Sequence, residues 1–114
     1  MEYTIYSITS QNVDVTGIYV GSTNDLDHRK SVHKYDSKNE TKTHMKLYKC
    51  NNENGGWENW EFKILEIFKC DFQYEAFIKE RYYIDKLQAD LIHIGHILQE
   101  KKLKIKGLNV KRKF

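Results

Sequence analysis

Two runs rich in β-branched and aromatic residues, separated by a short polar stretch, lie at the start of the chain. Residues 3–8 read Tyr-Thr-Ile-Tyr-Ser-Ile, and residues 16–21 read Thr-Gly-Ile-Tyr-Val-Gly. The stretch between them, residues 10–14, is polar and contains turn-forming residues. This pattern predicts an antiparallel β-hairpin. The hairpin would place Tyr6 and Tyr19 on neighbouring strands, so the rest of the chain must complete a sheet.

Later segments supply a third strand and three helices. Residues 60–68 alternate apolar and polar side chains over most of their length, which indicates a strand. The segments with helical character are about residues 25–34, a second helix through Met45, Leu47 and Tyr48 that residues 51–56 should end, and about residues 71–90. Thr23 or Asn24 is the expected N-cap of the first helix, and residues 35–43 are expected to be a polar connector. The predicted fold is α+β, with a small three-stranded antiparallel sheet flanked by helices.

The longest predicted helix carries an acid within its apolar stripe. Ala76, Phe77, Tyr83 and Ile84 follow the spacing of one helix face, and Glu80 lies on the same face. A carboxylate buried there costs several kcal/mol through desolvation unless a cation compensates its charge. We therefore expect a metal ion or an arginine beside Glu80.

The length and the charge distribution limit the organisation of the chain. A chain of 114 residues fits one core, so residues 1–114 are expected to form a single domain. Residues 101–114 form a basic C-terminal tail with seven Lys or Arg and no acid. Such a tail could lie along phosphates or remain solvated, and the sequence leaves both open. Residues 92–98 could form another helical turn or two, whereas residues 102–106 alternate like an edge strand, so the structure of residues 92–107 stays open.

Transport and membrane signals are not visible in the sequence. No apolar run approaches the roughly 18 residues of a membrane span, and the first residues lack a basic region followed by an apolar one. Cys50 and Cys70 stand apart without a second pair, which is typical of small apolar side chains rather than of a zinc module. We expect a soluble intracellular protein, in the cytoplasm or the nucleus, without a membrane partner.

Several residues of these elements share the order and spacing of the motifs of a known family. The triplets Thr4-Ile5-Tyr6 and Tyr19-Val20-Gly21 come first. The positions that follow them in the same pattern are Ser22, Thr23, Leu26, Arg29, His33, Glu75, Ala76, Glu80, Leu108 and Asn109. Together they resemble the GIY-YIG endonucleases over nearly the whole chain. The sequence departs from the pattern at Thr4, which replaces a glycine, and at Val20, which replaces an isoleucine.

The resemblance implies a metal-dependent endonuclease that hydrolyses phosphodiester bonds in DNA. The implied catalytic residues are Tyr6, Tyr19, Arg29, His33, Glu80 and Asn109. The residues expected to contact nucleic acid are Thr23, Lys30 and Lys34. Glu80 would hold Mg²⁺ or Mn²⁺, and one carboxylate suffices because Mg²⁺ keeps several waters. Tyr6 would position the attacking water or remove its proton, which requires neighbouring cations to lower the pKa of its phenol.

Other functions remain open at this level. A catalytically inactive nucleic-acid-binding module would keep the same fold and the same basic tail, and a protein-interaction domain would bind no DNA. Glu80 could also pair with Arg29 in a purely structural ion bridge. Related nucleases with defined targets generally carry a separate DNA-recognition module, for which this chain has no room. A homodimer is one way to gain specificity.

Overall fold

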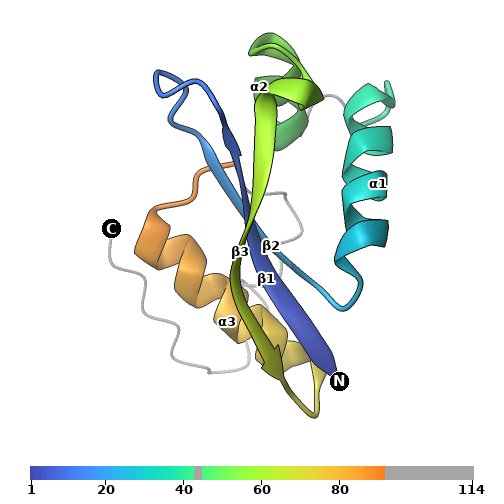
Figure 1. Ribbon diagram of the computed structural model, residues 1–114, viewed down its shortest axis with the longest axis vertical. Helices are drawn as coiled ribbons and strands as arrows, with labels where there is room; N and C mark the ends of the chain where they lie inside the picture. The colour runs from blue at the N-terminus through green and yellow to red at the C-terminus, as the bar shows by residue number, and fades with distance from the viewer. Residues whose placement is uncertain (43–44, 92–114) are drawn as a thin grey trace.

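A three-stranded antiparallel sheet with helices on both faces forms the protein (Figure 1). The computed structural model describes residues 1–42 and 45–91. The strands are β1 (Glu2–Ser10), β2 (Ile18–Thr23) and β3 (Trp60–Lys69), arranged in the order β2-β1-β3. The helices are α1 (Leu26–Lys38), α2 (Lys46–Glu53) and α3 (Gln73–Leu87), and a 3₁₀ turn, Trp57–Asn59, precedes β3. The predicted α+β class, hairpin and third strand are confirmed.

Strand register places the two tyrosines of the hairpin on the same face of the sheet. In the β1–β2 ladder Tyr6 pairs with Gly21, and Ile8 pairs with Tyr19. Because side chains alternate along a strand, Ile5 points to the opposite face. The β1–β3 ladder has a register shift between Ile5 and Tyr6, which marks a β-bulge beside the first phenol.

Each face of the sheet has its own apolar core. On one face a cluster joins the sheet to α2, and its buried residues are Tyr6, Ile8, Tyr19, Leu47, Tyr48, Trp60 and Leu91. On the other face Ile5 and Val20 pack against Ile84 of α3 and against Ala89. Burying a large apolar side chain contributes roughly 1.5–3 kcal/mol, so these two clusters hold the helices against the sheet. Cys70 is buried in a third small cluster, and Cys50 packs beside the first.

The helix boundaries differ from those predicted for α1. Its N-cap is Asp25, whose carboxylate accepts the N–H of His28 at 3.1 Å, rather than Thr23 or Asn24. The helix continues to Lys38, because no glycine or proline interrupts it, so the first part of the predicted connector is helical. Asp36 therefore belongs to α1, and its side chain is buried.

The helix α3 is shorter than predicted at both ends. The carboxylate of Glu75 accepts the backbone N–H groups of Asp71 and Phe72, both at 2.8 Å, so these residues lie before the helix. Gln88 ends the helix in a left-handed conformation with φ of 53°. Across residues 1–42 and 45–91, none of the helices combines the length and the apolar character needed to span a membrane.

Some predictions fall beyond the part of the chain that the structure describes. Asn109, the basic segment 101–114 and the alternatives for residues 92–107 all lie outside the described residues.

Candidate active site

Two buried phenols stand side by side on the hairpin. The ring centroids of Tyr6 on β1 and Tyr19 on β2 are 6.2 Å apart, and both side chains are almost fully buried. The glycine opposite Tyr6 explains how the first phenol fits. A Cβ atom at Gly21 would lie 2.5 Å from the Tyr6 hydroxyl oxygen and 2.7 Å from its Cζ. The hydroxyl of Tyr6 therefore lies against the bare backbone of β2.

The helix α1 brings a guanidinium and an imidazole to the hydroxyl of Tyr6. His33 Nε2 lies 2.8 Å from this oxygen, and Arg29 Nε donates to it at 3.4 Å. Arg29 and His33 are four residues apart, so they project from the same face of the helix. The His33 ring has no exposed surface and packs edge-on against Tyr19, with a centroid separation of 5.3 Å. These contacts give the Tyr6 hydroxyl two nitrogen partners in a water-poor environment.

An acid from α3 reaches the site around the open edge of the sheet. Because β2 is an edge strand, alternate backbone groups of β2 point away from β1. Two of them are bonded from the α3 side: the Ile18 N–H donates to Asp90 Oδ1 at 3.0 Å, and Ser22 hydrogen-bonds Glu80 through its backbone. The Ser22 hydroxyl also donates to Glu80 Oε1 at 3.2 Å. These bonds hold the Glu80 carboxylate at Ser22. Ser22 is next to Gly21 in β2, and the Tyr6 hydroxyl lies against Gly21.

Burial dominates the protonation of Glu80. It raises the pKa of this carboxyl from 4.5 to about 7, although the hydrogen bonds from Ser22 and the charge of Arg29 act in the opposite direction. The charge of Arg29 favours the ionised form, so the arginine that the sequence predicts beside Glu80 is present.

Burial also governs the two phenols. It raises the pKa of Tyr6, and the hydrogen bond and charge of Arg29 lower it by a smaller amount. It raises the pKa of Tyr19 well above 10, and the charge of Glu80 adds to this effect. Arg29, one of the cations considered for lowering the pKa of Tyr6, does act in that direction, but desolvation of the ring has the larger effect. Burial lowers the pKa of Arg29, but its interactions with the two phenols raise it by more and keep the guanidinium charged.

A family model for the GIY-YIG catalytic domain matches residues 2–92. This chain belongs to the GIY-YIG family. Members of this family are nucleases and generally depend on divalent metals, and the matched range includes both phenols, Arg29, His33 and Glu80. Comparisons with curated proteins and with solved structures gave no match.

The metal on which GIY-YIG nucleases depend has one candidate protein ligand here. Within the part of the chain that the structure describes, no three His, Cys, Asp or Glu side chains gather closely enough to hold a metal ion together. Glu80 fits a site with a single carboxylate, because a hard cation would stabilise the charged form that burial disfavours. Mg²⁺ takes its other ligands from water and from phosphate oxygens. The residues present therefore fit Mg²⁺ or Mn²⁺ better than a structural zinc centre.

The three residues predicted to contact nucleic acid lie in different environments. The Thr23 hydroxyl exchanges hydrogen bonds with the backbone of Asp25, both at 3.1 Å, so it stabilises the turn into α1. Lys30 Nζ lies 5.4 Å from the centre of the Phe62 ring, and Phe62 in turn packs against Tyr6. Lys34 is exposed on α1. Lys30 is thus at the rim of the site, and nucleic-acid contacts by all three stay a prediction.

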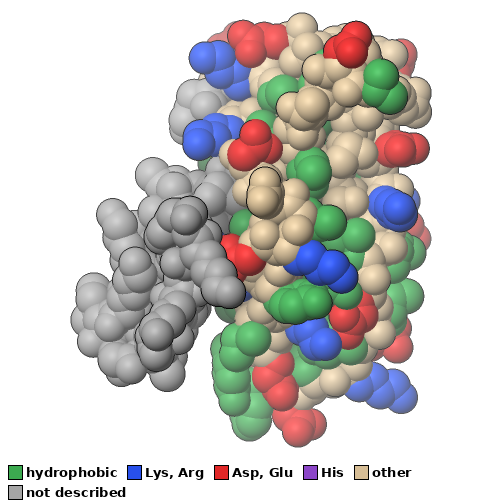
Figure 2. Space-filling model, turned by 90° about the vertical axis from the view of Figure 1, so that its left-hand side faces the viewer, with side chains coloured by type: hydrophobic (Ala, Val, Ile, Leu, Met, Phe, Trp, Pro, Cys, Tyr) green, Lys and Arg blue, Asp and Glu red, His purple; other side chains and the backbone are tan. Residues whose placement is uncertain are grey.

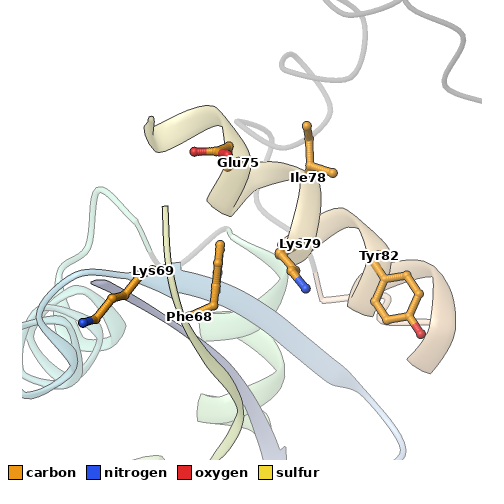
Figure 3. Close-up of a pocket in the computed structure, with 6 residues that line it drawn as sticks. All are labelled: Phe68, Lys69, Glu75, Ile78, Lys79 and Tyr82. Carbon is orange, nitrogen blue, oxygen red and sulfur yellow. The ribbon is translucent and has the colours of Figure 1, made fainter. Parts of the chain in front are cut away.

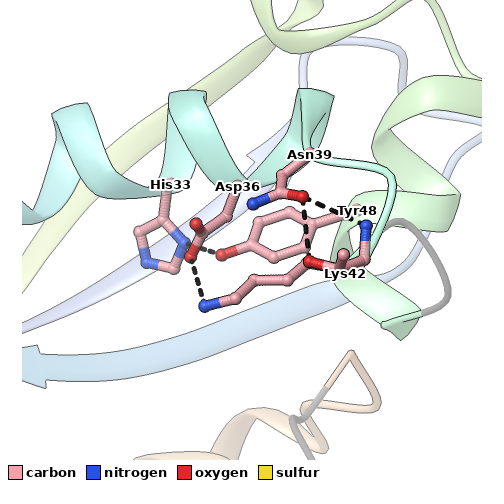
Figure 4. Close-up of polar contacts among 6 residues, drawn as sticks. His33, Asp36, Asn39, Lys42 and Tyr48 are labelled. Atoms are coloured by element: carbon pink, nitrogen blue, oxygen red, sulfur yellow. Dashed lines mark hydrogen bonds and ion pairs between the residues drawn. The ribbon is translucent and has the colours of Figure 1, made fainter.

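Two residues to which the sequence assigned no role in the site contact its members. The Tyr48 hydroxyl lies 3.0 Å from His33 Nδ1 (Figure 4), and Ser22 holds Glu80. Tyr48 was expected only as an apolar residue of the second helix, because its spacing shows burial but not the partner of its hydroxyl. Ser22 was a member of the motif without a role.

The apolar hollow on the other side of the molecule does not belong to this site. It has a volume of about 500 Å³ and lies between β3 and α3 (Figure 3). It is lined by Phe68, Lys69, Glu75, Ile78, Lys79 and Tyr82. None of these residues contacts the phenols. Hydrophobic and basic side chains are interspersed on the surface that Figure 2 shows, without a uniformly charged area.

Proposed function

We propose that this chain is a divalent-metal-dependent endonuclease that hydrolyses phosphodiester bonds in DNA. One observation carries the proposal: the buried hydroxyl of Tyr6 is bonded both to His33 Nε2 and to Arg29 Nε, within electrostatic reach of Glu80. These four groups come from three separate elements. A structural role alone does not require a phenol, a guanidinium, an imidazole and a carboxylate to converge.

Arg29, Glu80, Tyr19 and Tyr6 divide the requirements of phosphodiester hydrolysis among them. Arg29 stays charged, and its planar fork suits the non-bridging oxygens of the scissile phosphate. Glu80 would hold Mg²⁺ or Mn²⁺, which when bound supplies charge stabilisation and a more acidic water. Tyr19 lies beside Tyr6 and is suited to hydrogen-bond the water or the phosphate. The fourth requirement, removal of a proton from the water, falls to Tyr6.

The proton passes from the water to the phenol as the phenol gives up its own. Burial raises the pKa of Tyr6, so a free phenolate does not accumulate near neutral pH. His33 Nε2, at 2.8 Å, accepts the hydroxyl proton of Tyr6 while the Tyr6 oxygen takes a proton from the attacking water. The water oxygen bonds to phosphorus, the bond from phosphorus to the leaving oxygen breaks, and the leaving oxygen takes a proton from solvent water. This route requires a neutral His33 with an unprotonated Nε2.

Cleavage of supercoiled plasmid with and without Mg²⁺ tests the proposal. The wild-type protein is expected to nick the plasmid only with Mg²⁺ present. Tyr6→Phe and Glu80→Ala are each expected to lower the nicking rate by about 10²- to 10⁴-fold, the range that removal of an acid–base group gives. Tyr82→Phe and Glu58→Ala, the same changes at exposed positions, are expected to keep the wild-type rate. DNA binding without nicking would contradict the proposal and favour a catalytically inactive binding module.

A further inference from the structure

A second series of buried polar contacts continues behind His33, on the side away from Tyr6. His33 Nδ1 lies 3.0 Å from the hydroxyl of Tyr48, which in turn hydrogen-bonds Asp36. Asp36 is paired with Lys42, whose Nζ lies 3.4 Å from Oδ2 (Figure 4). The exposed fractions of His33, Tyr48 and Asp36 are 0%, 1% and 8%. The contacts run from the buried phenol of Tyr6 to a carboxylate at the end of α1.

The chemistry of these groups favours one direction for the hydrogen bonds in the series. An ionised carboxylate only accepts, so Tyr48 donates its hydroxyl proton to Asp36. The Tyr48 oxygen has then used its one proton and must accept from His33 Nδ1–H. A neutral imidazole carries one proton, so Nε2 is left with a lone pair and accepts the hydroxyl of Tyr6.

The protonation of Tyr48 agrees with this direction. Burial raises the pKa of Tyr48, and the neighbouring charge of Asp36 raises it further. The phenol therefore keeps its proton and remains a donor to Asp36 throughout the neutral range. If Tyr48 instead donated to His33, the buried carboxylate of Asp36 would lose one donor and keep Lys42, and a lost hydrogen bond to a charged group costs about 1.5–3 kcal/mol.

We propose that Asp36 and Tyr48 are positioning residues, which hold His33 in the tautomer whose Nε2 accepts the proton of Tyr6. The catalytic consequence rests on the proposed nuclease function, whereas the tautomer is a property of the folded protein alone. Without Asp36 and Tyr48, His33 would spend part of the time in the other tautomer, with a proton on Nε2. Tyr6 would then have no acceptor when it deprotonates the water.

Nitrogen NMR of the imidazole rings tests the tautomer directly. Two-bond ¹H–¹⁵N correlations are recorded at about pH 8, where a histidine of ordinary pKa near 6.5 is neutral, and His33→Gln identifies the His33 signals. The wild-type ring is expected to carry its proton on Nδ1. In Asp36→Asn the new amide donates to Tyr48, which then donates to Nδ1, so the proton is expected to move to Nε2. Tyr48→Phe removes the partner of Nδ1 and is expected to reduce the Nδ1-protonated fraction.

A matched control separates this effect from loss of the nearby ion pair. Lys42→Met removes the charge beside Asp36 without removing any group of the series, so it is expected to leave the tautomer unchanged. A wild-type ring protonated on Nε2 would overturn the proposal. An unchanged tautomer in both Asp36→Asn and Tyr48→Phe would overturn it as well, and because Tyr48→Phe keeps the buried ring, it provides the test if Asp36→Asn does not fold.

Kinetics show whether the tautomer matters for catalysis. Asp36→Asn and Tyr48→Phe are expected to lower kcat for plasmid nicking by about 10²-fold or more, with little change in KM, because neither residue touches the substrate. Lys42→Met is expected to keep the wild-type kcat. An altered His33 tautomer with an unchanged kcat would contradict the proposed effect of Asp36 and Tyr48 on catalysis. If the wild-type protein cuts no DNA, the nuclease proposal fails while the NMR result still decides the tautomer.

Discussion

The replacement Gly21→Ala tests how closely the first phenol lies against β2. Gly21 pairs with Tyr6 across the hairpin, and a methyl group there would meet the Tyr6 hydroxyl at 2.5 Å, its Cζ at 2.7 Å and Tyr19 Cε1 at 2.9 Å. All three distances are shorter than a carbon atom tolerates. The backbone of Gly21 is not in the left-handed region, so lack of space is the only objection to alanine.

The size of the effect follows from the rigidity of what the methyl group meets. Both phenol rings are almost fully buried and cannot swing away, so the rings or β2 must shift. Overpacking of this kind costs typically about 1–3 kcal/mol. Alanine regains about 0.5–1 kcal/mol relative to glycine through the unfolded chain. A net loss of about 0.5–2 kcal/mol in the free energy of unfolding is expected, with a larger loss of nicking because the Tyr6–His33 bond is displaced.

Urea unfolding and plasmid nicking measure the two effects, and Gly17→Ala is the matched control. The three heavy atoms nearest to a methyl group at Gly17 would all belong to the Leu91 side chain, whereas a methyl group at Gly21 would face the two phenols. Gly17→Ala is expected to keep the wild-type nicking rate. A Gly21→Ala protein with wild-type stability and wild-type nicking would refute the packing of Tyr6 described above.

Two further predictions concern charged groups of the site. Because the folded state holds the proton of Glu80 with a pKa of about 7 against 4.5 in the unfolded chain, the stability that this group contributes is present below pH 4.5 and is lost as the pH rises through 7. In urea unfolding with a chelator at about pH 8.5, the free energy of unfolding of Glu80→Gln is therefore expected to exceed that of the wild type by on the order of 3 kcal/mol. Equal free energies of unfolding would contradict burial of the charged carboxylate. Arg29→Lys keeps the charge but loses the Nε donor to Tyr6 and the planar fork, so kcat for nicking is expected to fall by about 10²-fold. A wild-type kcat in Arg29→Lys would show that charge alone suffices.

Much of the scaffold is visible in the sequence because local patterns determine it. The alternation in residues 3–8 and 16–21 reflects a sheet with two covered faces, and the same alternation places Tyr6 and Tyr19 together. The stripe around Glu80 shows that this acid is buried. These features follow from the periods of strands and helices, which depend on neighbouring residues only.

The contacts that tune the chemistry depend on packing between distant segments. Asp36 falls in a stretch without apolar periodicity, so nothing local shows that α1 continues and buries it against Tyr48. The bond from Ser22 to Glu80 requires that β2 be an edge strand with α3 beside it. The raised pKa of Tyr6 depends on how deeply its ring is buried, a quantity that a motif does not contain.

Tyr6 and Glu80, which are far apart in the chain, are proposed to act in one metal-dependent site. A double-mutant cycle on the single-turnover nicking rate tests it most directly, with Tyr6→Phe, Glu80→Gln and the double variant compared at saturating Mg²⁺. Residues that act as a unit give strongly non-additive losses. We predict that the double variant is no slower than the slower single variant. Losses that multiply in the double variant, or single variants that nick at the wild-type rate, would contradict the account.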